Sequence, residues 1–280
     1  MKMRHKYLPE DMERMRELYL NGCGQRTIGR ILQVPWQSVW PFIRHIPKED
    51  RKRLPVTGVT LPIPKHAQNM SDAKARILGY IMAEGCLVVF KKKHLRQNKW
   101  SVHKYCCAGN QIAFYNEDTA VINRFILDFN EVYGITLKYN VNRMETRCYR
   151  KEVFHDLNKY GPYGSLLWRI PEEIINGKTS FKKEWLKAFC DGESYVEDRP
   201  PHKRIVIYSN NKEGLLQIQR ILTRFDVSNY LNGPYGGTYR LRISGQNNIL
   251  AFHRNIGFYH SKKALKLNSL VQTLHSGHWH

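Results

Sequence analysis

The chain of 280 residues carries 45 Lys and Arg against 24 Asp and Glu, a formal net charge of +21 at pH 7, and 42% of its residues are apolar. This apolar content predicts a folded core and excludes global disorder, and the length allows two domains or one domain with an accessory module. A basic charge spread along the whole chain is typical of nucleic-acid-binding proteins. Because it has no run of about 18 apolar residues, no apolar N-terminal signal and no paired-cysteine spacing, we expect an intracellular, DNA-associated protein without a membrane span.

Residues 1–46 are predicted to form a helix-turn-helix DNA-binding module. In LPEDMERMRELYLNG, Pro9 and acidic residues begin a helix that a glycine ends, and QRTIGRILQVPWQSVW has the pattern of two further short helices. Gln33 occupies the turn position where glycine is usual, and Pro41 fits the last helix only in its first turn. The residues expected to approach a DNA groove are Trp36, Gln37 and Ser38. A three-helix packing module without a role in DNA binding is the alternative.

Residues 47–70 form a proline-rich basic segment, which we interpret as a linker. Four prolines and the charged run KEDRKR are typical of stiff, extended connections. Such a linker would let an N-terminal module bind DNA beyond the footprint of the rest of the chain and raise affinity through effective concentration.

The remaining residues show one order of elements twice. The first copy, residues 71–178, is predicted to contain a helix at 72–85, strands at 87–91 and 100–108, a helix at 117–133, strands at 136–141 and 145–150, and a helix at 151–159. The second copy, residues 179–280, is predicted to contain a helix at 181–194, strands at 195–197 and 203–209, a helix at 212–225, strands at 228–232 and 238–244, and helices at 246–255 and 261–274. This duplication predicts an α+β fold of two αββαββα halves related by a pseudo-twofold axis.

The first helix of each copy ends in a glutamate and carries the same pattern of residue types. The two stretches are ILGYIMAEG, ending at Gly85, and LKAFCDGES, ending at Ser194. When Glu84 is aligned with Glu193, each stretch has two small residues four positions apart, on one helix face. These small residues are Gly79 and Ala83 in the first copy and Ala188 and Gly192 in the second. Two helices packed on these faces would place both glutamates side by side, an arrangement suited to divalent cations.

The paired stretches resemble the LAGLIDADG motifs of homing endonucleases, in which the eighth motif position is acidic. The resemblance covers roughly residues 72–274, and the chain departs from the motif at Met82 and Ser194. It implies a pseudo-symmetric monomer that hydrolyses both strands of a long double-stranded DNA target, as in intron homing. The cofactor implied is Mg²⁺, for which Mn²⁺ or Ca²⁺ can substitute in the site.

The same resemblance implies roles for particular residues of this chain. Glu84 and Glu193 are the expected metal ligands and catalytic acids, with the backbone at Gly85 and Ser194 completing the coordination. Asp191 is expected to act at the helix end and not as a ligand. The basic catalytic residues expected to stabilise the transition state are Lys262, Lys263 and, as the weaker candidate, Arg169.

Basic and alternating segments of the predicted strands suggest the DNA-contacting surface. The run KKKHLRQNK is predicted to be a loop between the first two strands, and SVHKYCCAGN and TYRLRIS alternate like strands with one free face. The predicted contacts to phosphates and bases are Lys91, Lys92, Lys93, Arg96, Lys99, His103, Tyr105, Arg240 and Arg242.

Two alternatives on the same fold remain open at this stage. A catalytically silent DNA-binding regulator would be expected to have lost the motif acids, whereas Glu84 and Glu193 are both present. An intron maturase that binds RNA can keep both the fold and the acids, so only binding experiments separate it from the nuclease.

Overall fold

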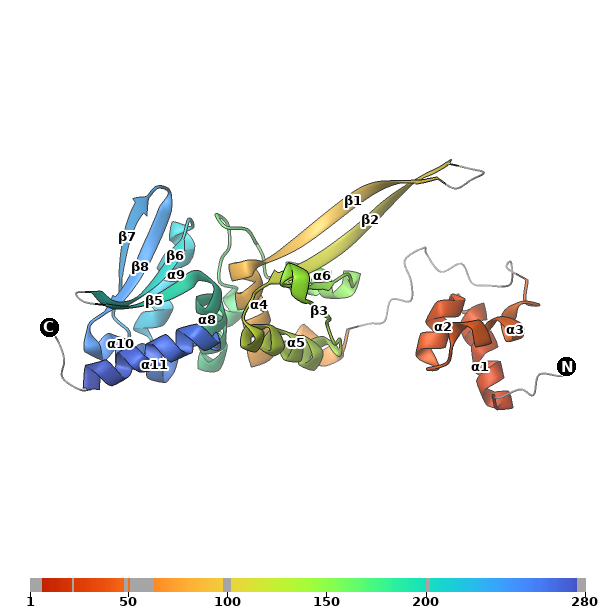
Figure 1. Cartoon of the computed structure of the whole chain (residues 1–280), viewed down its shortest axis with the longest axis horizontal. Helices are drawn as coiled ribbons and strands as arrows, with labels where there is room; N and C mark the ends of the chain where they lie inside the picture. The colour runs from red at the N-terminus through yellow and green to blue at the C-terminus, as the bar shows by residue number, and fades with distance from the viewer. Residues whose placement is uncertain are drawn as a thin grey trace. The chain divides into compact units, whose positions relative to one another are not determined.

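The computed structural model describes residues 7–21, 23–47, 50, 63–97, 102–199 and 202–275, with the backbone alone described at 91–97, 102–108 and 275. The chain forms two compact units, Met1–Pro62 and Ile63–His280 (Figure 1). Among the described residues, no helix is long and apolar enough to cross a membrane.

The N-terminal unit is a small helical module with its own core. Its elements are α1 (Pro9–Leu20), α2 (Gln25–Ile31), the 3₁₀ helix η1 (Trp36–Ser38) and α3 (Trp40–Ile43). Met15, Ile28 and Val39 are completely buried together. Gln33 adopts a φ of 55°, the left-handed conformation that glycine usually supplies in such a turn. Pro41 lies in the first turn of α3, where its missing N–H costs no helical hydrogen bond.

The C-terminal unit begins before its first motif helix. The 3₁₀ helix η2 (Lys65–Gln68) buries Ala67, and Ile63 and Met70 pack against the same core. The Lys74 ammonium fixes this segment, because its Nζ donates to the carbonyl of Ala67 at 2.6 Å. Residues 63–70, which the sequence assigned to a linker, therefore pack on the core, and 51–62 lie outside the described part of the chain.

The first half of this unit follows the predicted order. Its elements are α4 (Asp72–Glu84), β1 (Gly85–Gln97), β2 (Val102–Tyr115), α5 (Thr119–Tyr133), β3 (Tyr139–Asn140), η3 (Val141–Arg143), β4 (Glu145–Cys148) and α6 (Lys151–Asn158). The strands form an antiparallel sheet in the order β1-β2-β4-β3. One prediction was wrong: most of KKKHLRQNK lies in β1 and not in a loop, so that Lys91, Lys92, Lys93 and Arg96 occupy strand positions. Cross-strand pairing continues this hairpin through the charged run.

The second half repeats this order and adds a final helix. A short helix, α7 (Glu172–Ile175), precedes it, and its own elements are α8 (Thr179–Glu193), β5 (Ser194–Arg199), β6 (His202–Ser209), α9 (Lys212–Thr223), β7 (Tyr230–Tyr235), β8 (Thr238–Ser244), α10 (Gln246–Asn255) and α11 (Ser261–His275). The sheet order, β5-β6-β8-β7, matches that of the first half. The α+β fold with two αββαββα halves is thus confirmed, and α7 is an element that the sequence did not predict.

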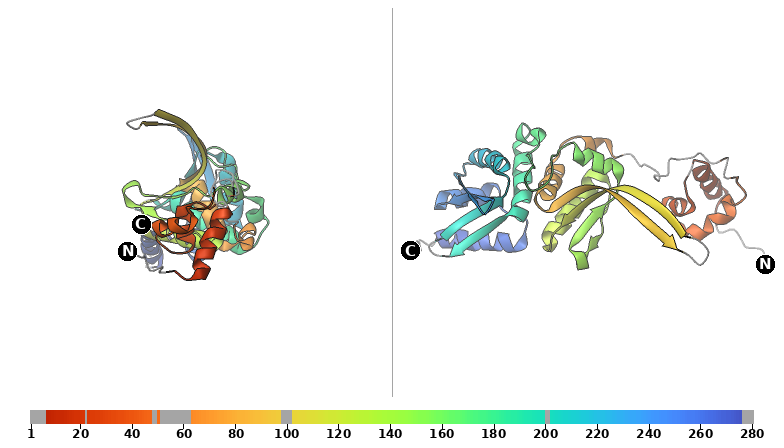
Figure 2. Two further views of the ribbon diagram at one scale, coloured as in Figure 1. Left: turned by 90° about the vertical axis from the view of Figure 1, so that its right-hand side faces the viewer. Right: turned by 90° about the horizontal axis from the view of Figure 1, so that it is seen from above.

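The two motif helices pack against each other between the halves (Figure 2). A Cβ atom at Gly79 would lie 2.5 Å from the carbonyl oxygen of Trp185 and 3.0 Å from Ala188 Cβ, and one at Gly192 would lie 2.7 Å from Ala83 Cβ. These distances are too short for real side chains, so the helices meet on their small residues as predicted. One buried core continues through both halves.

Candidate active site

Glu84 and Glu193 are the last residues of α4 and α8, and the close helix packing brings them together. A Cβ atom at Gly192 would lie 2.9 Å from Glu84 Cγ, so the end of α8 contacts the Glu84 side chain directly. Burial and the negative charge of Glu84 raise the pKa of Glu193 to about 7. The seam therefore holds two partly buried carboxylates that repel each other.

The carboxylate of Glu84 is held by a residue that the sequence analysis missed. Asn116 Nδ2 donates a hydrogen bond to Glu84 Oε2. Burial raises the pKa of Glu84, and the Asn116 hydrogen bond and the Lys263 charge act in the opposite direction. The strand pairing is the signal that could have identified Asn116. β1 starts directly after Glu84 and pairs antiparallel with β2, with Gly85 opposite Phe114. The end of β2, and with it Asn116, therefore lies next to Glu84.

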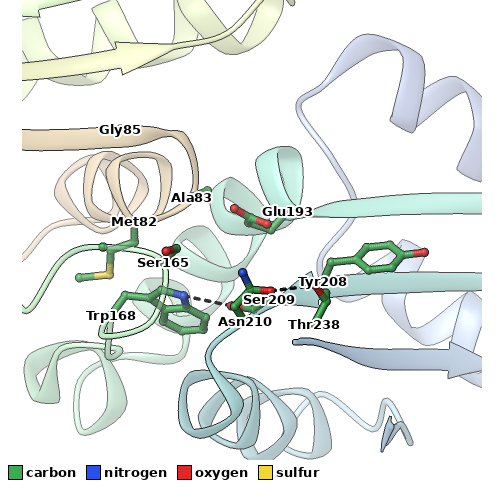
Figure 3. Close-up of a pocket in the computed structure, with 11 residues that line it drawn as sticks. Met82, Ala83, Gly85, Ser165, Trp168, Glu193, Tyr208, Ser209, Asn210 and Thr238 are labelled. Carbon is green, nitrogen blue, oxygen red and sulfur yellow. Dashed lines mark hydrogen bonds between the residues drawn. The ribbon is translucent and has the colours of Figure 1, made fainter. Parts of the chain in front are cut away.

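A cavity of about 310 Å³ opens beside Glu193 (Figure 3). Its wall includes Gly85, from the first half, and polar side chains of the second half and of the segment between the halves. These polar residues are Ser165, Ser209, Asn210 and Thr238. Since a water molecule occupies about 30 Å³ of liquid, the space suffices for a hydrated cation or a phosphate group next to the carboxylate.

Of the three basic residues predicted, Lys263 lies at the acids. Its Nζ donates to the backbone carbonyls of Cys190 at 3.3 Å, Gly192 at 3.2 Å and Asp191, at the C-terminal end of α8, where a positive charge is favoured. Burial lowers the pKa of Lys263, and the charges of Asp191, Glu84 and Glu193 oppose that shift.

The other two basic candidates have different partners. Lys262 is 80% exposed and pairs with Glu117 at 3.6 Å. Arg169 Nη1 donates to Asn211 Oδ1 and to the carbonyl of Trp168, each at 3.0 Å. Asn211 is the N-cap of α9, so the contacts of Arg169 join the segment before α7 to the second half.

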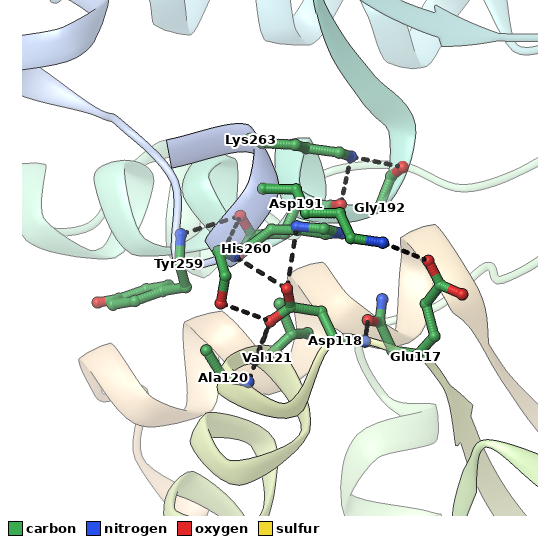
Figure 4. Close-up of polar contacts among 12 residues, drawn as sticks. Glu117, Asp118, Ala120, Val121, Asp191, Gly192, Tyr259, His260 and Lys263 are labelled. Atoms are coloured by element: carbon green, nitrogen blue, oxygen red, sulfur yellow. Dashed lines mark hydrogen bonds and ion pairs between the residues drawn. The ribbon is translucent and has the colours of Figure 1, made fainter. Parts of the chain in front are cut away.

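Two aspartates fix the start of α11, which carries Lys263 (Figure 4). Asp191 Oδ1 accepts from the backbone N–H groups of Tyr259 at 2.9 Å and His260 at 3.0 Å. Asp118, the N-cap of α5, accepts from the backbone N–H of Ser261 at 3.0 Å and lies 3.2 Å from His260 Nδ1. Asp191 thus acts through backbone contacts at the start of α11, and the sequence analysis missed this contact and Asp118.

The arrangement fits a divalent cation that uses few protein ligands. Within the described ranges, no group of three or more His, Cys, Asp and Glu side chains could hold a metal ion. Mg²⁺ is typically bound by one or two carboxylates together with substrate phosphates and water, and a cation would relieve the repulsion between Glu84 and Glu193. Gly85 lines the cavity with Glu193. At the second helix end, the Ser194 hydroxyl donates to the carbonyl of Cys190 at 2.6 Å.

The sheet of the second half has a free face rich in arginine and tyrosine. The Arg240 guanidinium lies 4.9 Å from the ring centroid of Tyr235 and 5.7 Å from that of Tyr208, and Arg242 lies 5.9 Å from that of Tyr230. The residues that alternate with these arginines on β8, Leu241 and Ile243, are completely buried, so the arginines lie on the side away from the core.

The remaining predicted DNA contacts are only partly described. Lys91, Lys92, Lys93 and Arg96 belong to β1, and His103 and Tyr105 belong to β2, where His103 is opposite Arg96; Lys99 lies outside the described residues. In the N-terminal unit, Trp36 is 42% exposed and Arg26 lies 5.5 Å from its ring centroid. Gln37 and Ser38 share the turn of η1 with Trp36.

Comparison with known proteins identifies relatives. Residues 180–257 match the sequence model of a family described as LAGLIDADG-like domain. Homing endonuclease I-ApeI of Aeropyrum pernix is 24% identical over 184 residues, which cover 61% of this chain and 82% of the relative. The structure of I-DmoI in complex with DNA and Ca is 16% identical, covers 73% of this chain and 100% of that chain, and has a TM-score of 0.48.

A second solved structure, DUF199/WhiA from Thermatoga maritima, is 14% identical, covers 74% of this chain and 63% of that chain, and has a TM-score of 0.44. The sequence matches agree with the duplicated motif helices. The matched region begins in the first turn of the second motif helix and includes its glutamate, and the first motif helix packs against it and ends in the equivalent acid. Residues 180–257 therefore match a LAGLIDADG-like domain, and the chain is similar to homing endonucleases that carry this motif.

Proposed function

We propose that this protein is a site-specific DNA endonuclease that makes metal-dependent double-strand breaks at a long target site. The observation that carries the proposal is the pair of partly buried glutamates at the ends of α4 and α8, one from each half. A DNA duplex has two strands to cut, and the pseudo-twofold arrangement supplies one acid for each. The net charge of +21 and the arginine-rich free face support a polyanionic partner.

Glu84 and Glu193 would hold divalent cations, with Mg²⁺ as the expected ion and the backbone at Gly85 and Ser194 as further ligands. A cation there would neutralise charge on the scissile phosphate and lower the pKa of the attacking water. The residues of the chain prepare this site. Asn116 orients the Glu84 carboxylate through its hydrogen bond, and both acids must lose their protons before they can bind a cation.

Lys263 is the residue that we assign to charge stabilisation. Its ammonium is fixed by three carbonyls at the end of α8, and its charge acts on both Glu84 and Glu193. A fixed positive charge next to the reacting phosphate stabilises the additional negative charge of the transition state. Lys262 and Arg169 have partners elsewhere and are the weaker candidates.

A monomer suffices for this activity, because one chain supplies both acids. The free face of the second sheet, with Arg240 and Arg242, and the β1–β2 hairpin, with its lysines, would contact the DNA on either side of the cut. Contacts to about ten phosphates would make the logarithm of the affinity fall steeply with the logarithm of salt concentration, by about 0.9 per contact. A slope shallower than about 3 would contradict contacts along both halves.

The central experiment measures cleavage and binding of a DNA duplex. This duplex joins the two sequences that flank the reading frame, so that it represents the gene without the insertion. The double variant Glu84→Gln/Glu193→Gln is expected to bind this DNA in Ca²⁺ with nearly unchanged affinity and to cut neither strand in Mg²⁺. Glu213→Gln, on the exposed first turn of α9, makes the same type of substitution away from the site and should cut normally. Cleavage by the double variant at the wild-type rate would disprove the assignment of the acids.

The same experiment separates the alternatives. Specific DNA binding by the wild-type chain without cleavage in Mg²⁺ or Mn²⁺ would indicate a silent regulator. Preferential binding of the intron RNA, with stimulation of its splicing, would indicate a maturase.

We further propose that residues 1–46 bind DNA through the surface around Trp36, Gln37 and Ser38. Deleting residues 1–46 should shorten the footprint at one end of the target and weaken binding, while cleavage survives at saturating protein, because both acids belong to the other unit. An unchanged footprint and affinity would show that the module has another role.

A further inference from the structure

The free face of the second sheet contains a buried carboxylate next to arginines. Glu197 on β5 is only 7% exposed, and it lies opposite Arg204 on β6. Arg204 Nε donates to Glu197 Oε2 at 2.6 Å, and Arg199 Nε lies 3.8 Å from Glu197 Oε1. Burial acts to raise the pKa of Glu197, but hydrogen bonds from Arg204 and Tyr195 outweigh it and hold that pKa below its usual range. The carboxylate is therefore ionised at neutral pH.

The strand register places Arg204 on the same face as the arginines of β8. Arg204 is opposite Ser244, and Arg242 is opposite Val206; directly opposite residues share a face, as do residues two apart on one strand. Ile205 and Ile207, which alternate with Arg204, are completely buried in the core. Arg204 thus faces the side that the proposed function assigns to DNA.

The guanidinium of Arg204 is anchored at one end and free at the other. Its bond to Glu197 uses Nε, and no described residue accepts a hydrogen bond from either terminal nitrogen. Arg147 in the first half differs, because its Nη2 donates to Glu145 at 2.6 Å and its Nη1 to the Tyr149 hydroxyl at 3.4 Å. The terminal nitrogens of Arg147 are thus occupied by the protein, whereas those of Arg204 are available to a ligand.

A neutralised arginine is poorly suited to binding phosphate but well suited to reading a base. Phosphate contacts gain affinity from net positive charge and counterion release, and Glu197 cancels much of that charge at Arg204. The terminal N–H groups of Arg204 remain as directional donors. Because Nε is held in place by Glu197, less conformational entropy is lost when these groups bind a ligand. In the major groove, two such donors match the O6 and N7 acceptors of guanine.

We propose that Arg204 determines specificity by reading one guanine of the target in the major groove, and that Glu197 positions it for that contact. This inference rests on the proposed DNA-binding function and adds to it one base of the target and the residue that selects it. The residues assigned to DNA from the sequence did not include this pair.

The test is a binding selection from a duplex DNA library of random sequence with the full-length protein in Ca²⁺, followed by sequencing of the bound DNA. The wild-type profile should contain one position at which guanine is preferred by about tenfold to a hundredfold, the usual range for a bidentate contact. Arg204→Ala should remove the preference at that position and leave the others unchanged. Glu197→Gln should weaken the same preference without moving it.

Two further variants keep the outcome interpretable. Arg204→Gln retains length and polarity, and it should lose the guanine preference or exchange it for adenine, which the glutamine amide matches. Arg220→Ala removes the same charge from the exposed surface of α9, which packs on the core side of the sheet, and should leave the profile unchanged. Thermal unfolding of each variant verifies that it is folded.

A profile for Arg204→Ala and Arg204→Gln that equals the wild-type profile at every position would overturn the inference, as would a wild-type profile without a preferred guanine. Cleavage of the selected DNA is measured separately in Mg²⁺. If the protein selects the guanine through Arg204 but cuts no DNA, this inference stands and the proposed nuclease activity is disproved.

Discussion

The two halves of the C-terminal unit are most alike at their shared seam and least alike at their outer ends. At the seam, Gly79 and Gly192 meet the partner helix at distances that exclude a larger side chain, and both helices end in glutamate. At the outer ends, β1 and β2 have 13 and 14 residues, whereas β5 and β6 have 6 and 8. Close packing constrains the seam, whereas the length of a paired strand is not constrained in this way.

The two acids also differ in their surroundings. Glu84 accepts a hydrogen bond from Asn116, which fixes the direction of its carboxylate. Glu193 instead borders the cavity lined by polar residues of the second half, and its pKa is raised to about 7 by burial and by Glu84. Each half thus has the acid at the same position of its motif helix, but the residues around the two acids differ. We therefore expect the two half-sites to be inequivalent.

The largest expected effect comes from removing one acid at a time. Glu84→Gln and Glu193→Gln should each lower the rate of cutting one strand by at least about a thousandfold, because loss of a metal ligand costs several kcal/mol of transition-state stabilisation. Opposite strands should be affected in the two variants. End-labelled duplexes report each strand separately, and loss of the same strand in both variants would show that the acids serve a single site.

Lys263→Met should lower the cleavage rate by roughly a hundredfold, the effect of removing one fixed donor from a developing negative charge. Lys262→Met is the matched control, because it makes the same substitution at the adjacent residue. Because Lys262 is 80% exposed, its loss should change the rate by no more than about twofold, in keeping with surface substitutions. Single-turnover rates at saturating protein measure both variants, and equal losses would contradict the distinction between the two lysines.

Gly79→Ala should destabilise the seam by roughly 1–3 kcal/mol, because the added Cβ forces the motif helices apart. The added atom would lie 2.5 Å from the Trp185 carbonyl oxygen, and backbone atoms cannot move aside as a flexible side chain does. Thermal unfolding should show a decrease of several degrees, compared with little change for the exposed helix variant Arg220→Ala. An unchanged melting temperature would mean that the helices adjust without loss of packing.

The pH dependence should distinguish the half-sites more subtly. Glu193 keeps its proton in the folded protein from its ordinary pKa of 4.5 up to about 7, and a cation must displace that proton. Affinity for Ca²⁺ should therefore rise by up to about tenfold per pH unit below 7 and level off above it. Without a cation, this carboxyl makes the protein less stable as pH rises through that window, because the unfolded chain has already ionised.

Calorimetric titration with Ca²⁺ at pH values on either side of 7 measures the effect. In Glu84→Gln, the repelling charge is absent, so the rise in affinity should shift to lower pH. A rise at the same pH in both proteins would mean that burial alone sets the pKa of Glu193.

Several features of this protein were determined by the sequence alone, because they depend on local periodicity. The small residues at Gly79 and Ala83 recur four positions apart at Ala188 and Gly192, and helical geometry then places each pair on one face. The αββαββα order, the contact between the motif helices and the meeting of Glu84 and Glu193 all follow from such short-range patterns.

The long β1–β2 hairpin was underestimated because its outer part contains charged residues in place of an alternating apolar pattern. Strand pairing satisfies the backbone hydrogen bonds there. Lys91 and its neighbours therefore occupy strand positions that hydrophobic alternation does not predict.

Only the tertiary structure decided which polar residues complete the site. Lys262 and Lys263 are adjacent in sequence, yet successive residues of a helix point about 100° apart, and the packing of α11 against the end of α8 brings Lys263 to the acids. Asn116 reaches Glu84 from 32 positions away, and Asp118 reaches Ser261 across 143 positions. Unlike the small-residue seam, these contacts of single polar side chains leave no periodic trace in the chain, because they depend on how complete elements pack.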